Sequence, residues 1–179
     1  MDKLQAIATN INYLSDTIDD FRAFLNPYAD SQDAYFKPTK SIAEILNILD
    51  AQLKNTNINI QTNMETTHFT FKGVENEFKQ VLFIIINNAI DAIKKRINDQ
   101  EIQNGEIKID LALDPEYGEV KIFDNGGGIK DEIKESIFEP YFTTKHKSSG
   151  TGLGLYIAKK IIESRMKGTI QVTDTDDGV

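Results

Sequence analysis

The stretch Asp124-Asn125-Gly126-Gly127-Gly128-Ile129 comes directly after the alternating run Glu119 to Phe123, which predicts a β-strand. Three consecutive glycines let the backbone approach a flat ligand closely, because no Cβ atom stands in the way. The carboxylate beside them can accept a hydrogen bond from an exocyclic amine, which favours adenine over guanine. Taken alone, this loop is also consistent with a simple turn, so its meaning depends on the rest of the chain.

A second glycine-rich loop, Gly150-Thr151-Gly152-Leu153-Gly154-Leu155, opens a helix predicted from about Gly152 to Ser164. The exposed N–H groups and the positive end of such a helix form an anion site that suits phosphates. No Gly-Lys-Ser/Thr follows, so the loop is not of the Walker A type. The alternative is that these glycines only allow close helix packing.

The longest helix of the body, predicted over residues 75–96, carries a polar face beside its apolar stripe. Asn88 and Asp91 fall on the polar face. An asparagine that faces a phosphate pocket can hold Mg²⁺ through its carbonyl oxygen, since hard cations prefer oxygen ligands. A lone helical asparagine is usually a solvated residue, and the two loops are what give Asn88 weight. The stripe is predicted to be Phe78, Val81, Leu82, Ile85, Ile86, Ala89, Ile90 and Ile93, and the polar face includes Glu77, Ile84 and Lys95.

These segments, taken in this order, resemble the nucleotide-binding motifs of sensor histidine kinases. The resemblance covers about Lys37 to Thr173, and the order of the motifs is specific although each motif is weak. Residues 87–92 (Asn-Asn-Ala-Ile-Asp-Ala) are similar to the N box, residues 124–129 to the G1 box, residues 137–145 (Ile-Phe-Glu-Pro-Tyr-Phe-Thr-Thr-Lys) to the F box and residues 150–155 to the G2 box.

The resemblance implies an α+β fold, a two-layer α/β sandwich in which helices back a mixed sheet. This is the Bergerat ATP-binding fold of the GHKL superfamily, which gyrase, mismatch-repair and chaperone ATPases share. The residue patterns predict a helix after Pro38 capped by Thr39 or Ser41, strands at 58–61 and 68–71, a hairpin of residues 106–113 and 119–123, and a last strand at 169–173.

The resemblance also implies a site for ATP and Mg²⁺, carried over residue by residue. Asp124 would bind the adenine amine, in a pocket shaped by Gly126 and Gly128. Asn88 would hold the metal, and Asn88, Lys145 and Thr144 are the candidate catalytic residues. The other implied nucleotide contacts are Ile129, Phe142, Gly150, Thr151, Gly152, Leu153 and Gly154.

The N-terminal residues have apolar positions at alternating spacings of three and four, from Leu4 to Leu25. This period predicts a long helix with a seam that needs a second helix or a second chain, or that lies on its own domain. The resemblance implies the second helix of a dimerisation and phosphoacceptor hairpin, and therefore a homodimer. We expect part of that helix at 1–27, a polar linker at 28–37 and the ATP-binding domain at 38–179, with its final strand truncated.

The sequence departs from the family in three places. The phosphoacceptor histidine of the family lies on the first hairpin helix, which we expect upstream of Met1. His68 is interpreted as a structural residue of a strand, and His146 as a solvated residue of the lid. Ile84 stands where the family usually has asparagine and related ATPases have a catalytic glutamate, and a tolerated variant is favoured over a weakened kinase. Asp91 stands where a phosphate-binding lysine is sometimes found.

Composition excludes several other classes of protein. The formal charge of −8 on 179 residues and the pI near 4.8 argue against a nucleic-acid partner. The chain has no cysteine, which excludes disulfides and thiolate chemistry. Its longest apolar run, Val81 to Ile86, is too short to span a bilayer, so we expect a cytoplasmic domain without membrane contact, in a parent protein that is either soluble or membrane-anchored.

The favoured function is the ATP-binding catalytic core of a two-component sensor histidine kinase. It would transfer the γ-phosphoryl group of ATP to a histidine on a hairpin helix that precedes this chain, for onward transfer to the receiver domain of a response regulator. One alternative is a non-catalytic ATP-sensing dimerisation module. The other is an ATPase of the gyrase or mismatch-repair type, against which the missing glutamate at position 84 argues.

Overall fold

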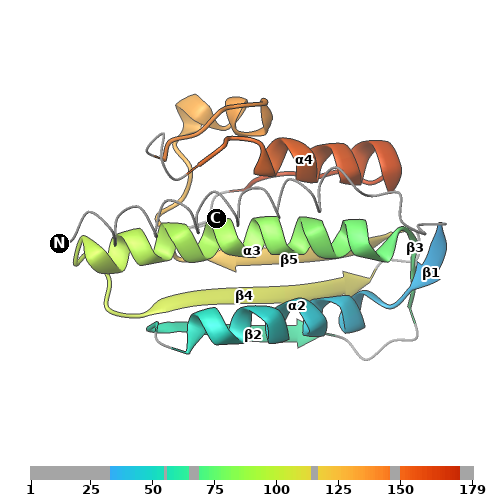
Figure 1. The fold of residues 1–179 in the computed structure, drawn as a ribbon, viewed down its shortest axis with the longest axis horizontal. Helices are drawn as coiled ribbons and strands as arrows, with labels where there is room; N and C mark the ends of the chain where they lie inside the picture. Colours follow the sequence, from blue (N-terminus) through green and yellow to red (C-terminus); the bar gives the residue numbers. More distant parts are fainter. Residues whose placement is uncertain (1–32, 55, 65–68, 114–116, 146–149, 174–179) are drawn as a thin grey trace, which may run out of the picture. The chain divides into compact units, whose positions relative to one another are not determined.

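The computed structural model describes residues 33–54, 56–64, 69–113, 117–145 and 150–173 (Figure 1). The predicted N-terminal helix, His68 and His146 lie outside the described residues. The elements are β1 (Ala34–Phe36), α2 (Pro38–Leu53), β2 (Ile58–Met64), β3 (Phe71–Gly73), α3 (Glu75–Asn98), β4 (Gly105–Leu113), β5 (Gly118–Asp124), the 3₁₀ turns η1 (Asp131–Ile133) and η2 (Ser136–Phe138), α4 (Gly154–Lys160) and the π-helical turn η3 (Ile161–Arg165).

The larger sheet is mixed, as predicted. Its strand order is β2-β4-β5, with β2 parallel to β4 and β4 antiparallel to β5. Along β4 the side chains alternate, because Ile107, Ile109 and Leu111 are buried while Glu106 and Lys108 are exposed. The register places Ile107 opposite Asp124 at the end of β5, so the first glycine loop leaves the sheet beside the start of β4.

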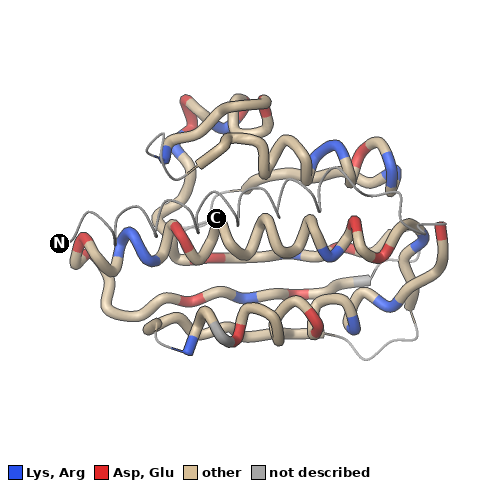
Figure 2. The backbone as a smooth tube through the Cα atoms, in the orientation of Figure 1, with Lys and Arg blue, Asp and Glu red and all other residues tan. Residues whose placement is uncertain are grey.

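Two helices cover the buried face of this sheet. Figure 1 shows α2 and α3 side by side over the strands, with α4 alongside α3. The stripe predicted on α3 is buried except for Ile85, and it packs with Ile42, Ile45 and Leu49 of α2 and with Ile107 and Ile109 of β4. The two-layer α/β arrangement and the long helix are therefore confirmed. In Figure 2, both helices carry acidic and basic residues.

The prediction of a linker over residues 28–37 is wrong at its end, because Ala34–Phe36 forms β1. This strand pairs antiparallel with β3, and Phe36 lies opposite Phe71. Phe36 is buried against Phe71 and Phe78, with ring centroids 6.1 and 5.4 Å away. Because this partner strand is distant in the sequence, local polarity could not reveal the pairing. The strand predicted at 68–71 begins only at Phe71 in the described residues.

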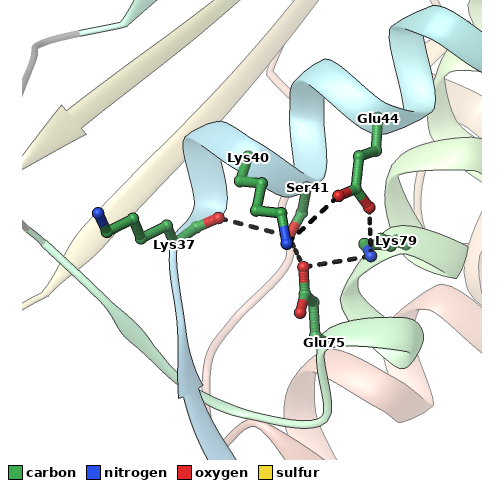
Figure 3. Close-up of polar contacts among 6 residues, drawn as sticks. All are labelled: Lys37, Lys40, Ser41, Glu44, Glu75 and Lys79. Carbon is green, nitrogen blue, oxygen red and sulfur yellow. Dashed lines mark hydrogen bonds and ion pairs between the residues drawn. The ribbon is translucent and has the colours of Figure 1, made fainter.

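The start of α2 also differs from the prediction, since neither Thr39 nor Ser41 caps it. Lys37 occupies the cap position without a side-chain cap bond, and Pro38 begins the helix. The Ser41 side chain is instead fully buried, and its hydroxyl donates to Glu75 Oε1 at 3.0 Å, with Lys37 O at 3.4 Å as the alternative acceptor (Figure 3). Ser41 thus joins α2 to the first turn of α3.

An ion-pair network extends this junction. Lys79 of α3 contacts both Glu44 of α2 and Glu75 of its own helix, and Lys40 also reaches Glu44 at 3.5 Å (Figure 3). The hydrogen bond from Lys79 lowers the pKa of Glu44, and partial burial opposes the shift. The same bond raises the pKa of Lys79. The ion pairs of Glu44 with Lys79 and Lys40 therefore stabilise the α2–α3 contact only while Glu44 is ionised.

Beyond α3, two further predictions need correction. The helix predicted from Gly152 begins at Gly154 and continues into the π-helical turn η3, which ends at Arg165. Residues 169–173, predicted as a strand, adopt no regular structure. Alternation makes a strand possible, but a strand also needs a neighbour for its backbone groups, and residues 169–173 are paired with none of the described strands. Across the described residues no helix is both long and apolar enough to cross a membrane.

The end of α3 carries a Schellman turn built on a residue other than glycine. Glu101 N–H donates to Arg96 O at 2.9 Å, and Gln100 N–H donates to Ile97 O at 3.1 Å. Gln100 therefore adopts φ +59°, a left-handed conformation that glycine adopts at lower cost.

We expect Gln100→Gly to raise the free energy of unfolding by about 0.5 kcal/mol, because relief of the left-handed strain outweighs the added entropy of the unfolded chain. Denaturant unfolding measures the change. The matched control is Asp99→Gly, one residue earlier at φ −77°, which should lower stability. A loss of stability in Gln100→Gly would contradict this account of the turn.

The Glu44 network predicts a pH-dependent effect. Since the pKa of Glu44 is lowered by folding, its ionised form stabilises the protein above the pKa of the unfolded chain, and this contribution is lost as pH falls through the lowered pKa. Glu44→Gln should lower the unfolding temperature at neutral pH, and the difference should shrink as pH falls below the ordinary pKa of glutamate, about 4.3, and vanish below the lowered pKa. Thermal unfolding across this range checks it, with the exposed Lys40→Met as a control of little effect. A difference that persists in acid would refute the assignment.

Candidate functional site

One ridge of α3 meets every loop that the sequence singled out. Residues four apart on a helix lie one above another on the same face. The ridge, defined here as Ile84, Asn88, Ala92 and Arg96, follows this spacing. Along it, Ile84 lies next to Gly154, Asn88 bonds Lys145, Ala92 lies next to Gly126, and Arg96 contacts Gly127 and Asn125.

The first glycine loop lies against the ridge at Ala92. Gly126 N–H donates to Asp124 Oδ1 at 2.7 Å, so the carboxylate is turned back over its own loop. A Cβ atom on Gly126 would meet Asp124 Oδ1 at 2.5 Å and the Ala92 Cβ at 2.6 Å. Glycine is therefore required here by the close approach of the loop to α3, a reason that sequence reasoning did not give.

The carboxyl group of Asp124 is partly buried, and this burial raises its pKa, while the hydrogen bond from Gly126 works in the opposite direction. A carboxylate placed in such a position carries a desolvation cost in the absence of a ligand. A ligand amine would return a hydrogen bond to it, which suits the role predicted for Asp124.

The side chain of Asn125 anchors this loop to the sheet. Its Oδ1 accepts from Glu106 N–H at 2.8 Å, and its Nδ2 donates to Asn104 O at 3.1 Å. Its own N–H donates to Glu106 O at 3.2 Å. Sequence reasoning passed over Asn125 because it stands at a variable position of the motif, yet these bonds fix where the loop leaves β5.

Asn88 and Lys145 come together as the resemblance implied. Lys145 Nζ donates to Asn88 Oδ1 at 3.3 Å and to Asp91 Oδ2 at 2.6 Å. The amide oxygen of Asn88 therefore already faces a positive charge. Lys145 is oriented by its own local turn, in which its N–H donates to Thr143 Oγ1 at 3.1 Å. Thr144, beside it, is exposed.

The second glycine loop packs on the segment similar to the F box. Gly152 has φ +67°, and a Cβ atom there would lie 2.4 Å from the carbonyl carbon of Tyr141 and 2.8 Å from the oxygen of Phe142. A Cβ on Gly150 would meet Thr143 Oγ1 at 2.8 Å. Glycines at both positions thus allow the two segments to lie side by side.

The start of α4 rests on the ridge at Ile84. The position of a Cβ on Gly154 lies 3.2 Å from Ile84 Cγ2. Leu153 N–H donates to Thr151 Oγ1 at 3.4 Å, and Leu153 O accepts from Ile157 N–H at 2.9 Å as the helix begins. Ile84 is therefore a packing residue beneath the second glycine loop, which gives a physical reason for the departure from the family.

Glu77, which the sequence places on the polar face of α3 with Asn88, is buried. Its side chain is 7% exposed, and its two carboxylate oxygens bind Arg165 Nη2 at 3.0 Å and Arg165 Nε at 3.2 Å. This paired contact ties the start of α3 to the end of η3. Lys159 also lies over the Phe138 ring at 5.2 Å, so α4 is held to both neighbouring segments.

The predicted site residues form two groups along the ridge. Asp124, Gly126 and Gly128 belong to the first loop, in which Gly128 has φ +74° and Ile129 is half-buried. Asn88, Lys145 and the loop from Gly150 to Gly154 form the second group, with Phe142 beneath Gly152. The described residues contain no cluster of three or more His, Asp or Glu side chains that could hold a metal ion.

The matching protein family is described as histidine kinase-, DNA gyrase B- and HSP90-like ATPases, and it matches residues 73–179. The chain belongs to this family and carries an ATPase domain of the kind found in sensor histidine kinases.

Two curated relatives are a kinase and a two-component sensor by name. Sporulation kinase A of Bacillus subtilis is 32% identical over 146 residues, which cover 82% of this chain and 22% of the kinase. The two-component sensor PprA of Pseudomonas aeruginosa is 28% identical over 145 residues, 80% of this chain and 15% of the sensor. The chain thus spans about a fifth of these relatives or less.

Solved structures agree with the fold. The nucleotide-free catalytic domain of histidine kinase ThkA is 30% identical, with a TM-score of 0.71 over 82% of this chain and 90% of that domain. A structure of ThkA in complex with the response regulator protein TrrA is similar over 93% of this chain and 46% of that chain, with 26% identity and a TM-score of 0.70.

The burial of Asp124 predicts a substitution that does not destabilise the ligand-free protein. Since folding raises the pKa of this carboxyl, its ionised form opposes folding, and the cost grows as pH rises through the raised pKa. Asp124→Asn keeps an oxygen to accept from Gly126 N–H, so its unfolding temperature should equal or exceed that of the parent at neutral pH. The advantage should shrink towards about pH 4. Thermal unfolding without nucleotide measures it, and a clear destabilisation at neutral pH would show that the carboxylate is structural.

Proposed function

We propose that this chain is the ATP-binding catalytic core of a two-component sensor histidine kinase. The reaction would move the γ-phosphoryl group of ATP to a histidine on a dimerisation hairpin, and from there to a response regulator. The observation that carries the proposal is the ridge of α3, which gathers Asp124, Asn88 and both glycine loops on one side of one helix. The family, its sensor-kinase relatives and the ThkA–TrrA complex support the partner class.

The purine end of the nucleotide is assigned to Asp124. Its carboxylate is held over the first glycine loop by Gly126 N–H and is partly removed from water, where a hydrogen bond from an adenine amine is stronger than in solvent. Gly126 and Gly128 leave the loop without side chains, and Ile129 offers an apolar surface beside it.

The phosphate end is assigned to Asn88, Lys145 and the second glycine loop. The chemistry of Asn88 fits Mg²⁺, because its Oδ1 already accepts from a cation, and hard metal ions take amide oxygens as ligands. Bound there, the metal would neutralise charge on the phosphates. Asp91 holds Lys145 at 2.6 Å beside Asn88, so an ammonium group lies close to the metal position although position 91 itself is acidic. Thr144, Thr151 and the backbone from Gly150 to Gly154 complete the proposed contacts.

The transfer step requires little of the protein beyond position and charge. The bond from the γ-phosphorus to its bridging oxygen breaks, ADP leaves, and the phosphorus bonds an imidazole nitrogen of the acceptor. Lys145 would offset the negative charge on the transferred group, and Asn88 would hold the metal ion. Position 84 is an isoleucine that packs under Gly154, and it offers no carboxylate to activate water. This favours transfer to histidine over ATP hydrolysis.

Asp124→Asn should weaken the binding of Mg²⁺·ATP by roughly 10- to 100-fold, since a charge-assisted hydrogen bond is replaced by a mismatched amide. Asn88→Ala should remove the dependence of ATP affinity on Mg²⁺. Calorimetric titration measures both. The matched control is Asn87→Ala, whose side chain bonds Phe83 O within α3 and should leave binding unchanged.

Phosphotransfer is then tested by adding a dimerisation hairpin from a related sensor kinase in trans with radiolabelled ATP. Acid-labile label on the hairpin, with none on this chain, is the expected result. Binding of ATP without any transfer would instead favour an ATP-sensing module. The proposal would be overturned if the folded parent protein did not bind ATP. It would also be overturned if Asp124→Asn bound ATP as tightly as the parent.

A further inference from the structure

We propose that Arg96 is a positioning residue for the adenine end of this site, which the motif comparison does not assign. Its guanidinium group would hold the first glycine loop in the shape that presents Asp124 to a purine. The inference rests on the proposed function, because it concerns the same pocket. It is carried by the contacts that Arg96 makes with the first glycine loop and with Glu101, just after the end of α3.

The first contact fixes the loop from the helix side. Arg96 Nη1 donates to Asn125 O at 2.9 Å, and the Arg96 Cδ lies 3.2 Å from the position of a Cβ on Gly127. The stem of the arginine thus lies along the glycine backbone while its head holds a carbonyl of the loop. Asn125 is bonded to β4 by its own side chain, so the loop is held between the sheet and Arg96.

The second contact fixes the arginine itself. Arg96 Nε donates to Glu101 Oε2 at 3.0 Å, and Glu101 N–H donates to Arg96 O at 2.9 Å. Glu101 is therefore attached to Arg96 by backbone and by side chain, through the Schellman turn that ends α3. The guanidinium also lies in the last turn of α3, where a positive charge is favoured. Its orientation is consequently set before any ligand binds.

The loop needs such a support because of its composition. Gly127 and Gly128 adopt φ +98° and +74°, and glycines lose more conformational freedom than other residues when they are ordered. Because the loop is already ordered before binding, the free energy of binding is not reduced by the entropic cost of ordering it. Without the bond from Arg96, Asp124 would keep its chemistry but lose part of its fixed position.

The test compares Arg96→Met, which keeps the stem and removes the donors, with the parent and with Arg96→Lys. Adenosine, which lacks phosphates, and Mg²⁺·ATP are titrated well below the unfolding temperature. We expect Arg96→Met to weaken both ligands by the same factor, roughly tenfold, and Arg96→Lys to recover part of it. Hydrogen exchange at Gly126 to Gly128 should be faster in ligand-free Arg96→Met.

The matched control is Lys95→Met, which removes the same charge from the adjacent exposed position and should change neither affinity nor loop exchange. A purely structural arginine would lower the unfolding temperature but leave adenosine affinity and the local exchange unchanged, and that result overturns the proposal. If Arg96→Met does not fold, Glu101→Gln is tested instead, because it keeps the arginine and weakens the bond that orients its guanidinium group. A smaller loss of adenosine affinity is expected. Unchanged adenosine binding and unchanged loop exchange in Glu101→Gln would also overturn the proposal.

The two proposals fail in different ways. A parent protein that binds no nucleotide would contradict the proposed function, while the exchange rates would still show whether Arg96 holds the loop. If the parent binds adenosine and Arg96→Met binds it equally tightly, only the positioning role is contradicted. An affinity loss for ATP without one for adenosine would place Arg96 at the phosphates and would also contradict it.

Discussion

The four-residue spacing of one helical ridge is the constraint on which the site depends. Ile84, Asn88, Ala92 and Arg96 project from the same side of α3; Ile84 meets the second glycine loop, Asn88 meets Lys145, and Ala92 and Arg96 both meet the first glycine loop. The opposite side of α3 is buried against the sheet and α2, so the helix cannot rotate without exposing the core. The packing of apolar residues on one face therefore determines where the polar groups on the other face point.

Two carboxyl groups, one in the proposed site and one at the α2–α3 junction, affect the stability of the fold in opposite ways. Burial raises the pKa of Asp124, which shows that the fold holds this carboxylate at a cost, whereas Glu44 at the α2–α3 junction has a lowered pKa and supports the fold in its ionised form. Two polar anchors keep this loop in place: Asn125, which follows β5 and bonds Glu106 of β4, and Arg96 of α3. The direction of the pKa shift therefore differs between the carboxyl group proposed for binding, where it is upward, and the one that supports the fold, where it is downward.

Two departures from the family acquire a physical reason in the structure. Ile84 is accommodated because it packs under Gly154, a contact that an apolar side chain makes well. Asp91 is accommodated because Lys145, fifty-four positions later in the chain, brings an ammonium group to it and to Asn88. A change of residue type within a motif is thus interpretable only together with the segment that folds onto it.

The sequence alone determined the elements whose signals are local or repetitive: the apolar stripe of α3, the alternation of β4, the two glycine loops and the set of motifs that name the family. It could not find β1, the buried ion pair of Glu77 with Arg165, or the roles of Asn125 and Arg96. It also predicted a strand at 169–173 that the tertiary structure does not form. Each of these depends on a partner far away in the chain. Periodicity and turn chemistry are properties of neighbours in sequence, whereas pairing, burial of charge and the direction of a long side chain are decided only when distant segments meet.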